Sequence, residues 1–186
     1  IPTAHAGNID ALGEYVALAD SLGATMNFSL LSASVENDDL AAVLPDDAAL
    51  ERLAQATLAL SRDGVPVLSD TPVSTRLTTT CGCGAGCTMV SVSADGEVFP
   101  CHMMHDEAFS LGSLLEDSGC LAARHAPAPR VAELAACADC DIRYLCGGGC
   151  RARAYFATGD VEARDPYCSL MRTFYRLLFE AMLGRN

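Results

Sequence analysis

The sequence contains no tryptophan, and its first 80 residues contain no cysteine, although the 186-residue chain has ten. No stretch reaches the roughly 18 apolar residues of a membrane helix, and no signal peptide is visible, so we expect a cytoplasmic protein that does not enter a membrane. Positive charge is also scarce, because 12 Lys and Arg stand against 24 Asp and Glu, for a net charge of −12. This balance argues against nucleic-acid binding, which depends on Lys and Arg meeting phosphates.

All ten cysteines lie after Thr80, so we place a domain boundary there and expect domains over 1–80 and 81–186. A cytoplasmic compartment is reducing, which disfavours disulfides and makes metal or cluster ligation the expected role. The cysteines are Cys81, Cys83, Cys87, Cys101, Cys120, Cys137, Cys140, Cys146, Cys150 and Cys168.

The cysteine-free part alternates predicted helices and strands. Apolar spacing and end signals predict helices over 9–22 and 45–62 and strands over 25–31 and 65–69. This βα repetition is typical of a parallel sheet. Two or three such units are too few to close a barrel, which takes about 200 residues or more.

Two local features of this part have predicted roles. Asn8 precedes the first helix and is of a residue type that caps helix N-termini. Asn27 and Ser29 alternate on the strand over 25–31, so both side chains point to one face. If that face is a barrel interior, they lie on the substrate side.

The cysteine-rich part is predicted to begin with a β-hairpin. Residues 89–93 and 97–101 alternate in polarity and flank the turn Ala94-Asp95-Gly96. Further helices are predicted over 127–134, 151–158 and 166–183. The last of these has apolar residues at helical spacing, so we expect it to pack on the domain or on the barrel.

The strongest motif is Cys137-x2-Cys140-x5-Cys146-x3-Cys150, with Cys168 further on. Thiolates are soft ligands that suit iron–sulfur clusters or zinc. The three glycines at 147–149 allow the backbone to pass close to a bulky inorganic group, and their amides are placed to donate to cluster sulfurs.

Together with Cys81-x5-Cys87 and Gly96-x4-Cys101, this motif resembles the seven-cysteine pattern of SPASM domains, the C-terminal auxiliary-cluster domains of many radical SAM enzymes. The resemblance covers residues 81–184. The βα units before it resemble the last part of that family's partial barrel. The implied fold class is α/β followed by α+β: the C-terminal part of a partial (β/α) radical SAM barrel, then a small SPASM domain with a β-hairpin and helices around two clusters.

The resemblance implies two 4Fe–4S clusters with interleaved ligands. Carried over by position, the first set is Cys81, Cys87, Cys101 and Cys150, and the second set is Cys137, Cys140, Cys146 and Cys168. Cys83 and Cys120 are left over. Cys83 is an alternative to Cys81 as a ligand, whereas Cys120 is expected to be an ordinary small apolar residue.

The SAM-binding motif of the family, C-x3-C-x2-C, is absent from this sequence. Cys83-x3-Cys87 is followed by Val90 at the third position, and Cys146-x3-Cys150 is followed by Arg153. We therefore expect a fragment whose SAM site and third 4Fe–4S cluster belong to a missing N-terminal part, and which does not cleave SAM by itself.

For the full protein, the resemblance implies a radical SAM oxidoreductase that abstracts hydrogen from a peptide with a 5′-deoxyadenosyl radical. The expected substrate is a ribosomally made precursor peptide, modified by a thioether or carbon–carbon crosslink, epimerisation or a similar reaction. A protein substrate, as in formylglycine-forming sulfatase maturases, is the alternative. The two clusters would relay electrons from a reductant such as ferredoxin or flavodoxin, or position the substrate.

Several alternatives stay open at this point. Structural zinc in two four-thiolate sites also fits the cysteine count, although C-x5-C-x3-C with a glycine run is unlike paired zinc knuckles. A non-catalytic, metal-stabilised peptide-docking module and an electron carrier are further alternatives. His102 stands where some enzymes of that family have a catalytic carboxylate, and we interpret it as a histidine that lies at the surface or supports a ligand from behind. Arg151 and Arg153 either offset cluster charge or are solvated helix residues.

Overall fold

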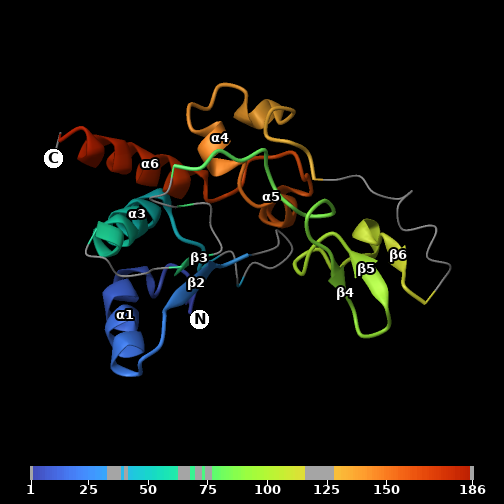
Figure 1. The fold of residues 1–186 in the computed structure, drawn as a ribbon, viewed down its shortest axis with the longest axis horizontal. Coiled ribbons are helices and arrows are strands. Elements are labelled where there is room, and N and C mark those ends of the chain that lie inside the picture. The colour runs from blue at the N-terminus through green and yellow to red at the C-terminus, as the bar shows by residue number, and fades with distance from the viewer. Residues whose placement is uncertain are drawn as a thin grey trace.

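The computed structural model of the chain describes residues 2–32, 39, 42–62, 68–69, 73, 77–115 and 128–184. Figure 1 shows helices α1 (Leu12–Ser21), α3 (Asp47–Arg62) and α6 (Cys168–Met182) at one end of the long axis of the molecule, the first sheet near its middle, and the second sheet at the other end. In these ranges, no helix combines the length and the apolar character needed to cross a membrane.

The first sheet is parallel, as the βα repetition predicts, and β2 is its middle strand. The strands are β1 (Thr3–Ala4), β2 (Asn27–Leu30) and β3 (Leu68–Ser69). Both predicted strands are thus confirmed in their described residues, while 65–67 lie outside them. β1 is not predicted, because a two-residue strand carries too little alternation to recognise.

Side chains of β2 alternate between two environments. Phe28 and Leu30 are buried in the main core, whereas Asn27 and Ser29 are half-buried on the other face. The hydroxyl of Ser29 lies 3.2 Å from that of Thr3, across the β1–β2 pair. The Oδ1 atom of Asn27 is buried and has no hydrogen-bond partner in the part of the chain that the structure describes.

The predicted N-terminal helix begins as the 3-10 helix η1 (Ile9–Ala11) and continues as α1 (Leu12–Ser21). Asn8 occupies the N-cap position of η1, as predicted, but its side chain makes no capping hydrogen bond. Its amide oxygen accepts a hydrogen bond from the His5 N–H, and its amide nitrogen donates to the Thr3 carbonyl, both at 2.9 Å. Asn8 therefore stabilises the turn between β1 and the helix instead of the helix end.

The second predicted helix is α3 (Asp47–Arg62). Asp46 supplies its N-cap, since its Oδ1 accepts a hydrogen bond from the Ala49 N–H at 2.7 Å.

The second sheet is antiparallel and confirms the predicted hairpin. It contains β4 (Ser91–Val92), β5 (Glu97–Phe99) and β6 (Gly112–Ser113), with β5 in the middle. Gly96 in the turn has φ = +85°, a left-handed conformation that favours glycine. The 3-10 helix η2 (Glu107–Phe109) lies between β5 and β6.

The remaining helices lie between and beside the two sheets. They are η4 (Ala135–Cys137), α4 (Arg143–Cys146), α5 (Arg151–Thr158) and α6 (Cys168–Met182). The last two confirm the predicted helices over 151–158 and 166–183.

The predicted helix over 127–134 is wrong in its described residues, 128–134, which form a turn and an isolated bridge. The N–H of Val131 donates to the Cys81 carbonyl at 2.8 Å, and the N–H of Ala128 donates to the Ala85 carbonyl at 3.2 Å. These backbone groups thus bond to the cysteine loop instead of to a helical turn.

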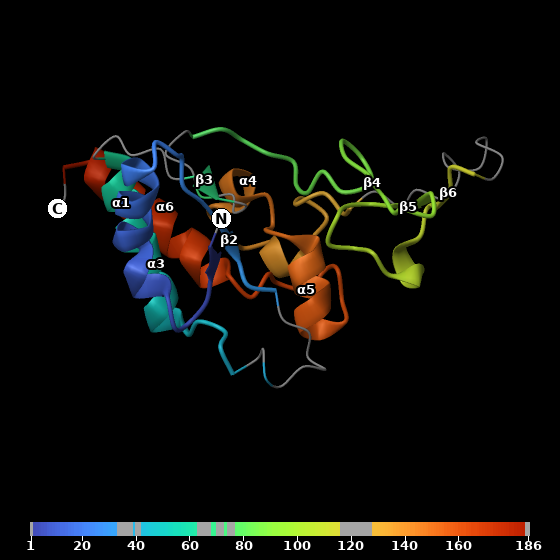
Figure 2. The same cartoon turned by 90° about the horizontal axis from the view of Figure 1, so that it is seen from below.

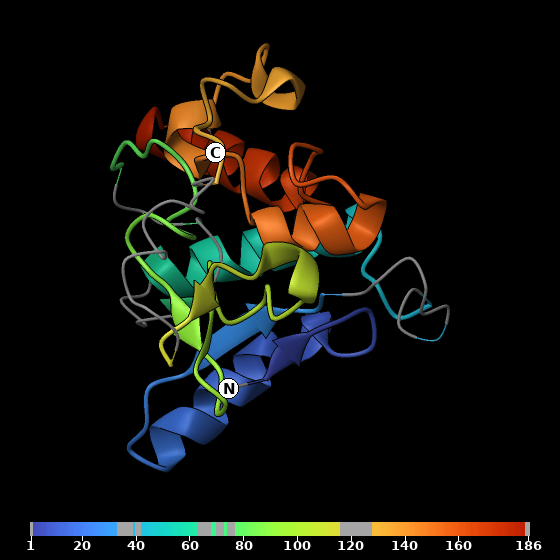
Figure 3. The same cartoon turned by 90° about the vertical axis from the view of Figure 1, so that its right-hand side faces the viewer.

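One apolar core joins the N-terminal sheet and helices to the C-terminal helix. Figures 2 and 3 show α6 lying against α3, and the buried residues Leu53, Met171 and Phe174 belong to the same cluster. This confirms the expected packing of the last helix. The Tyr167 hydroxyl also donates to the Leu31 carbonyl at 2.7 Å, directly after β2. The start of α6, which carries Cys168, is therefore fixed by contacts with the first sheet.

Candidate metal centres

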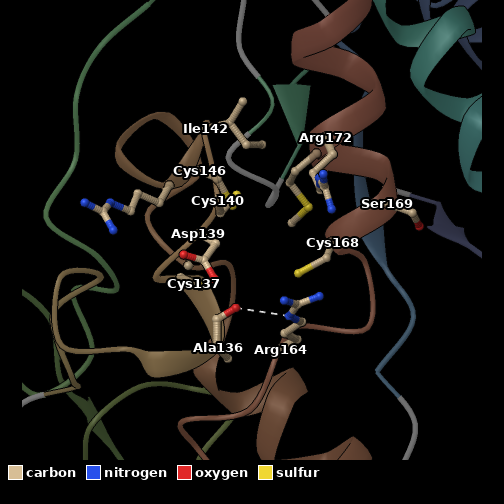
Figure 4. Close-up of a pocket in the computed structure, with 13 residues that line it drawn as sticks. Ala136, Cys137, Asp139, Cys140, Ile142, Cys146, Arg164, Cys168, Ser169 and Arg172 are labelled. Atoms are coloured by element: carbon tan, nitrogen blue, oxygen red, sulfur yellow. Dashed lines mark hydrogen bonds between the residues drawn. The ribbon is translucent and has the colours of Figure 1, made fainter.

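The second cysteine set is gathered around one cavity. Its four thiols line a space of about 260 Å³ between α4, the loop before it and the start of α6. Figure 4 shows Cys168 on one side of this cavity, facing the chain segment that carries Cys137, Cys140 and Cys146.

Local structure explains how each thiol reaches the cavity. Cys137 ends η4, and its carbonyl accepts a hydrogen bond from the Cys140 N–H at 3.1 Å. Cys146 is the last residue of α4, where its N–H donates to the Ile142 carbonyl at 2.9 Å. Cys168 is the first residue of α6, whose buried face fixes it against the core. The C-x2-C-x5-C motif thus begins at the end of the short helix η4 and finishes at the end of α4, and both helices lie on one side of the cavity.

Burial makes these thiols poor acids in the absence of a metal. It raises the pKa of Cys146 to about 12, and repulsion by Cys168 adds to that rise. Burial also raises the pKa of Cys168 to about 11, where repulsion by Asp165, Cys137 and Cys140 adds to the effect. The N–H groups of Gly148 and Gly149 act in the opposite direction on the Cys146 pKa, as donors to its thiolate. Thiolates at this site therefore need a cation to hold them, since metal coordination deprotonates a thiol outright.

The size and donor set of the cavity fit a cluster larger than a single ion. At about 260 Å³, the cavity is many times larger than the roughly 10–15 Å³ that one water needs by the same measure. A 4Fe–4S core has eight atoms and takes four thiolate ligands. Arg164 lines the same cavity, and its Nε donates to the Ala136 carbonyl at 3.0 Å (Figure 4).

The first cysteine set is split between two neighbouring environments. Cys81 and Cys87 are exposed and line a cavity of about 540 Å³ together with Cys83, Arg130 and Glu133.

Cys101 instead lies in a buried apolar cluster with Met104 and Ala152, and the partly buried Cys150 and Cys83 both pack against that cluster. Cys83 is thus the thiol that belongs to both environments, which keeps it a candidate ligand beside Cys81. Among the described residues, no group of three or more His, Cys, Asp and Glu side chains is arranged to hold a single metal ion.

The other candidate residues have simpler surroundings. His102 is exposed, in agreement with a position at the surface. His105, also exposed, stacks on Phe99 with ring centroids 4.5 Å apart, and its Nε2 lies 2.7 Å from the Ser91 hydroxyl. Cys120 lies outside the described residues.

The three glycines at 147–149 leave no room for a Cβ atom, because other groups of the protein lie too close to their Cα atoms. A Cβ atom on Gly147 would lie 2.7 Å from the Thr80 methyl carbon, and one on Gly148 would lie 2.6 Å from Leu134 Cδ1. A Cβ on Gly149 would lie 2.5 Å from a carboxylate oxygen of Asp165. The explanation that glycine makes room for an inorganic group is therefore incomplete, because all three positions are needed for close packing of the chain on itself.

Asp165 is the residue that the sequence analysis missed. It is 1% exposed, and its carboxylate accepts hydrogen bonds from the N–H groups of Cys150 at 2.6 Å and Tyr167 at 2.9 Å. It also forms an ion pair with Arg153 at 2.9 Å, in which both side chains are almost fully buried. Nothing in the polarity pattern distinguishes this aspartate from the exposed Asp160 in the same loop.

The interpretation of Arg151 and Arg153 as solvated residues is wrong, because they are 1% and 2% exposed. Arg151 donates to the carbonyls of Val161 and Ala163 at 2.8 Å and also to that of Gly148. It thus ties the glycine run to the loop that leads to Asp165.

No family model matches the chain. Among curated proteins it is 29% identical over 174 residues to the mycofactocin maturase MftC of Mycolicibacterium smegmatis, a match that covers 87% of the chain and 44% of that protein. It is 30% identical over 199 residues to the PqqA peptide cyclase of Granulibacter bethesdensis, covering 98% of the chain and 52% of that protein. The chain thus spans about half the length of these relatives.

Among solved structures, anSMEcpe with bound AdoMet and Cp18Cys peptide superposes with a TM-score of 0.67, over 98% of this chain and 56% of that one. At 13% identity this match shows a shared fold. The curated relatives found by sequence are radical SAM/SPASM maturases, and the chain is homologous to about half of their length.

Proposed function

We propose that the chain is the C-terminal portion of a maturase that modifies a ribosomally made peptide, and that it binds two auxiliary 4Fe–4S clusters. The observation that carries the proposal is the single cavity lined by Cys137, Cys140, Cys146 and Cys168. Such clusters take up and release single electrons when bound. The domains proposed are βα units of a partial barrel over 1–80 and a SPASM domain over 81–186.

The chain's own residues would hold and shield these centres. In the second set, the cysteines of η4 and α4 meet Cys168 across the cavity, and Arg164 favours the Cys168 thiolate by its positive charge. In the first set, Cys150 already packs against the buried apolar cluster that contains Cys101. The exposed loop with Cys81 and Cys87 would supply the other two ligands, with Cys83 as the alternative to Cys81.

The names of the relatives favour a peptide substrate. The curated sequence relatives include a mycofactocin maturase and PqqA peptide cyclases, whose names refer to the maturation or cyclisation of small peptides. The solved structure with the same fold has a peptide bound to it. We therefore propose a precursor peptide as substrate and a reductant such as ferredoxin or flavodoxin as electron donor, with the SAM site outside this sequence.

Ligand variants test the two-centre proposal. The chain is reconstituted anaerobically with iron and sulfide, and Cys168→Ser, Cys101→Ser and the double variant are compared with the wild type. Each single variant is expected to lose about half of the bound iron, and the double variant nearly all of it. Met171→Leu, a volume-conserving change beside the second cavity, is the control and should keep the wild-type iron content. Complete iron loss in either single variant would contradict two separate centres.

A further inference from the structure

Asp165 contacts the backbone of both cysteines that flank it. Its Oδ2 accepts the Cys150 N–H at 2.6 Å, and its main-chain carbonyl accepts the Cys168 N–H at 3.0 Å. In the proposed ligand sets, Cys150 belongs to the first centre and Cys168 to the second. One residue therefore sets the positions of two ligands that serve different centres.

The buried carboxylate of Asp165 is stabilised by hydrogen bonds and by an ion pair, which replace its lost contact with water. Its Oδ1 accepts the Tyr167 N–H at 2.9 Å, and Arg153 reaches its Oδ2 with Nη2 at 2.9 Å and Nε at 3.2 Å. A buried ion pair seldom adds net stability over apolar packing, because both charges must leave water. Its best-attested role is to fix one arrangement of the chain, and here the arrangement is that of Cys150 relative to Cys168.

Charge gives the pair a second effect. Arg153 favours the thiolate of Cys150, whereas Asp165 opposes the thiolates of Cys146, Cys150 and Cys168. Because the Arg153 guanidinium is paired with the Asp165 carboxylate at 2.9 Å, removing either charge would leave the other unbalanced beside Cys150 and Cys168. Together they add no net charge between two centres that are themselves negative when bound by thiolates.

We propose that Arg153 and Asp165 form a neutral positioning pair shared by the two metal centres. The pair holds Cys150 and Cys168 in fixed positions relative to each other, and its two opposite charges cancel near both centres. This inference rests on the proposed function, since it needs both centres to be present. It makes Asp165 and Arg153 positioning residues, because neither is proposed as a ligand.

The test is a redox titration of the reconstituted chain, in which dithionite adds one electron to each centre and electron paramagnetic resonance follows both. Asp165→Asn removes a negative charge and should favour reduction of both centres, whereas Arg153→Gln should disfavour it. A neighbouring charge shifts a protonation equilibrium by about one to three units. We therefore expect each reduction equilibrium to change about tenfold, which is 59 mV for a one-electron couple.

Two further variants separate charge from position. The double variant Arg153→Gln/Asp165→Asn removes the pair without changing net charge, so its two reduction equilibria should return to within about twofold of the wild type. Asp160→Asn makes the same substitution at an exposed residue of the same loop and should change nothing. If Asp165→Asn does not hold clusters, both centres should be lost together while the helix content is kept.

Three results would overturn the inference: shifts of the same sign in the two single variants, shifts no larger than that of Asp160→Asn, or loss confined to one centre. A failure of the proposed function looks different, because the wild-type chain itself would then hold no iron.

Discussion

Replacing Gly149 by alanine tests the close approach between the glycine run and Asp165. Gly149 has φ = +74°, and an added Cβ would lie 2.5 Å from Oδ2 and 2.6 Å from Cβ of that residue. The left-handed conformation costs an L-residue about 1–2 kcal/mol. Forcing an extra carbon into a packed site costs about 1–3 kcal/mol more. We therefore expect the free energy of unfolding to fall by about 2–5 kcal/mol.

The chain offers a matched control in Gly159. It has φ = +77°, but an added Cβ there would meet no atom within 4 Å, so only the conformational cost applies. For a chain of this size, 1 kcal/mol lowers Tm by about 2–4 °C. Gly149→Ala should lower Tm by about 4–20 °C and Gly159→Ala by about 2–8 °C, both measured by circular dichroism on the metal-free chain.

Measuring the iron content of Gly149→Ala and Gly159→Ala gives a second comparison of the two variants. Displacement of Asp165 by the new methyl group would disturb its hydrogen bonds from the Cys150 N–H and the Cys168 N–H, so Gly149→Ala should also reduce iron loading of both centres. Gly159→Ala should load normally. Equal Tm losses in the two variants, with equal iron contents, would refute the reasoning that Gly149 is needed to admit the carboxylate.

Further predictions concern ligands, thiol reactivity, domain contact and catalysis. If Cys81 is the ligand, Cys81→Ser should lose about half of the iron and Cys83→Ser should lose none, and the reverse result would assign the site to Cys83. In the metal-free folded chain at pH 8, Cys146 should be alkylated at least about a hundredfold more slowly than in urea, because burial raises its pKa to about 12 and leaves it protonated. That protection should disappear only as pH rises toward 12, and equal rates at pH 8 would show an open site. Tyr167→Phe removes the hydroxyl that bonds the main chain after β2 and should cost about 0.5–1.5 kcal/mol, whereas Tyr144→Phe at an exposed ring should cost none by thermal unfolding. Given SAM and dithionite, the chain alone should form no 5′-deoxyadenosine, and its appearance by chromatography would contradict the absence of a SAM-cleaving centre.

Much of the fold was predictable because its elements carry clear local signals. The helices α5 and α6 and the β4–β5 hairpin follow from apolar spacing and from the Ala94-Asp95-Gly96 turn. Residues 128–134 were wrongly predicted as helix, since the hydrogen bonds that hold them go to the distant loop at 81–85. Tertiary contacts of this kind leave no periodic pattern in the sequence.

The candidate site was predictable to the same extent. The resemblance to SPASM domains implies which cysteines form each set, and the four cysteines of the second set line one cavity. Spacing gives no information about Asp165, which is distinguished from Asp160 only by the backbone that folds around it. Nor does it separate Cys81 from Cys83, because both lie in the same glycine-rich loop and line the same cavity.

The most direct test of two auxiliary clusters is metal and sulfide analysis of the anaerobically reconstituted chain. The account predicts about eight irons and eight sulfides per chain, together with a broad visible absorption band that bleaches on reduction. Two zinc ions per chain, no sulfide and no colour would contradict it.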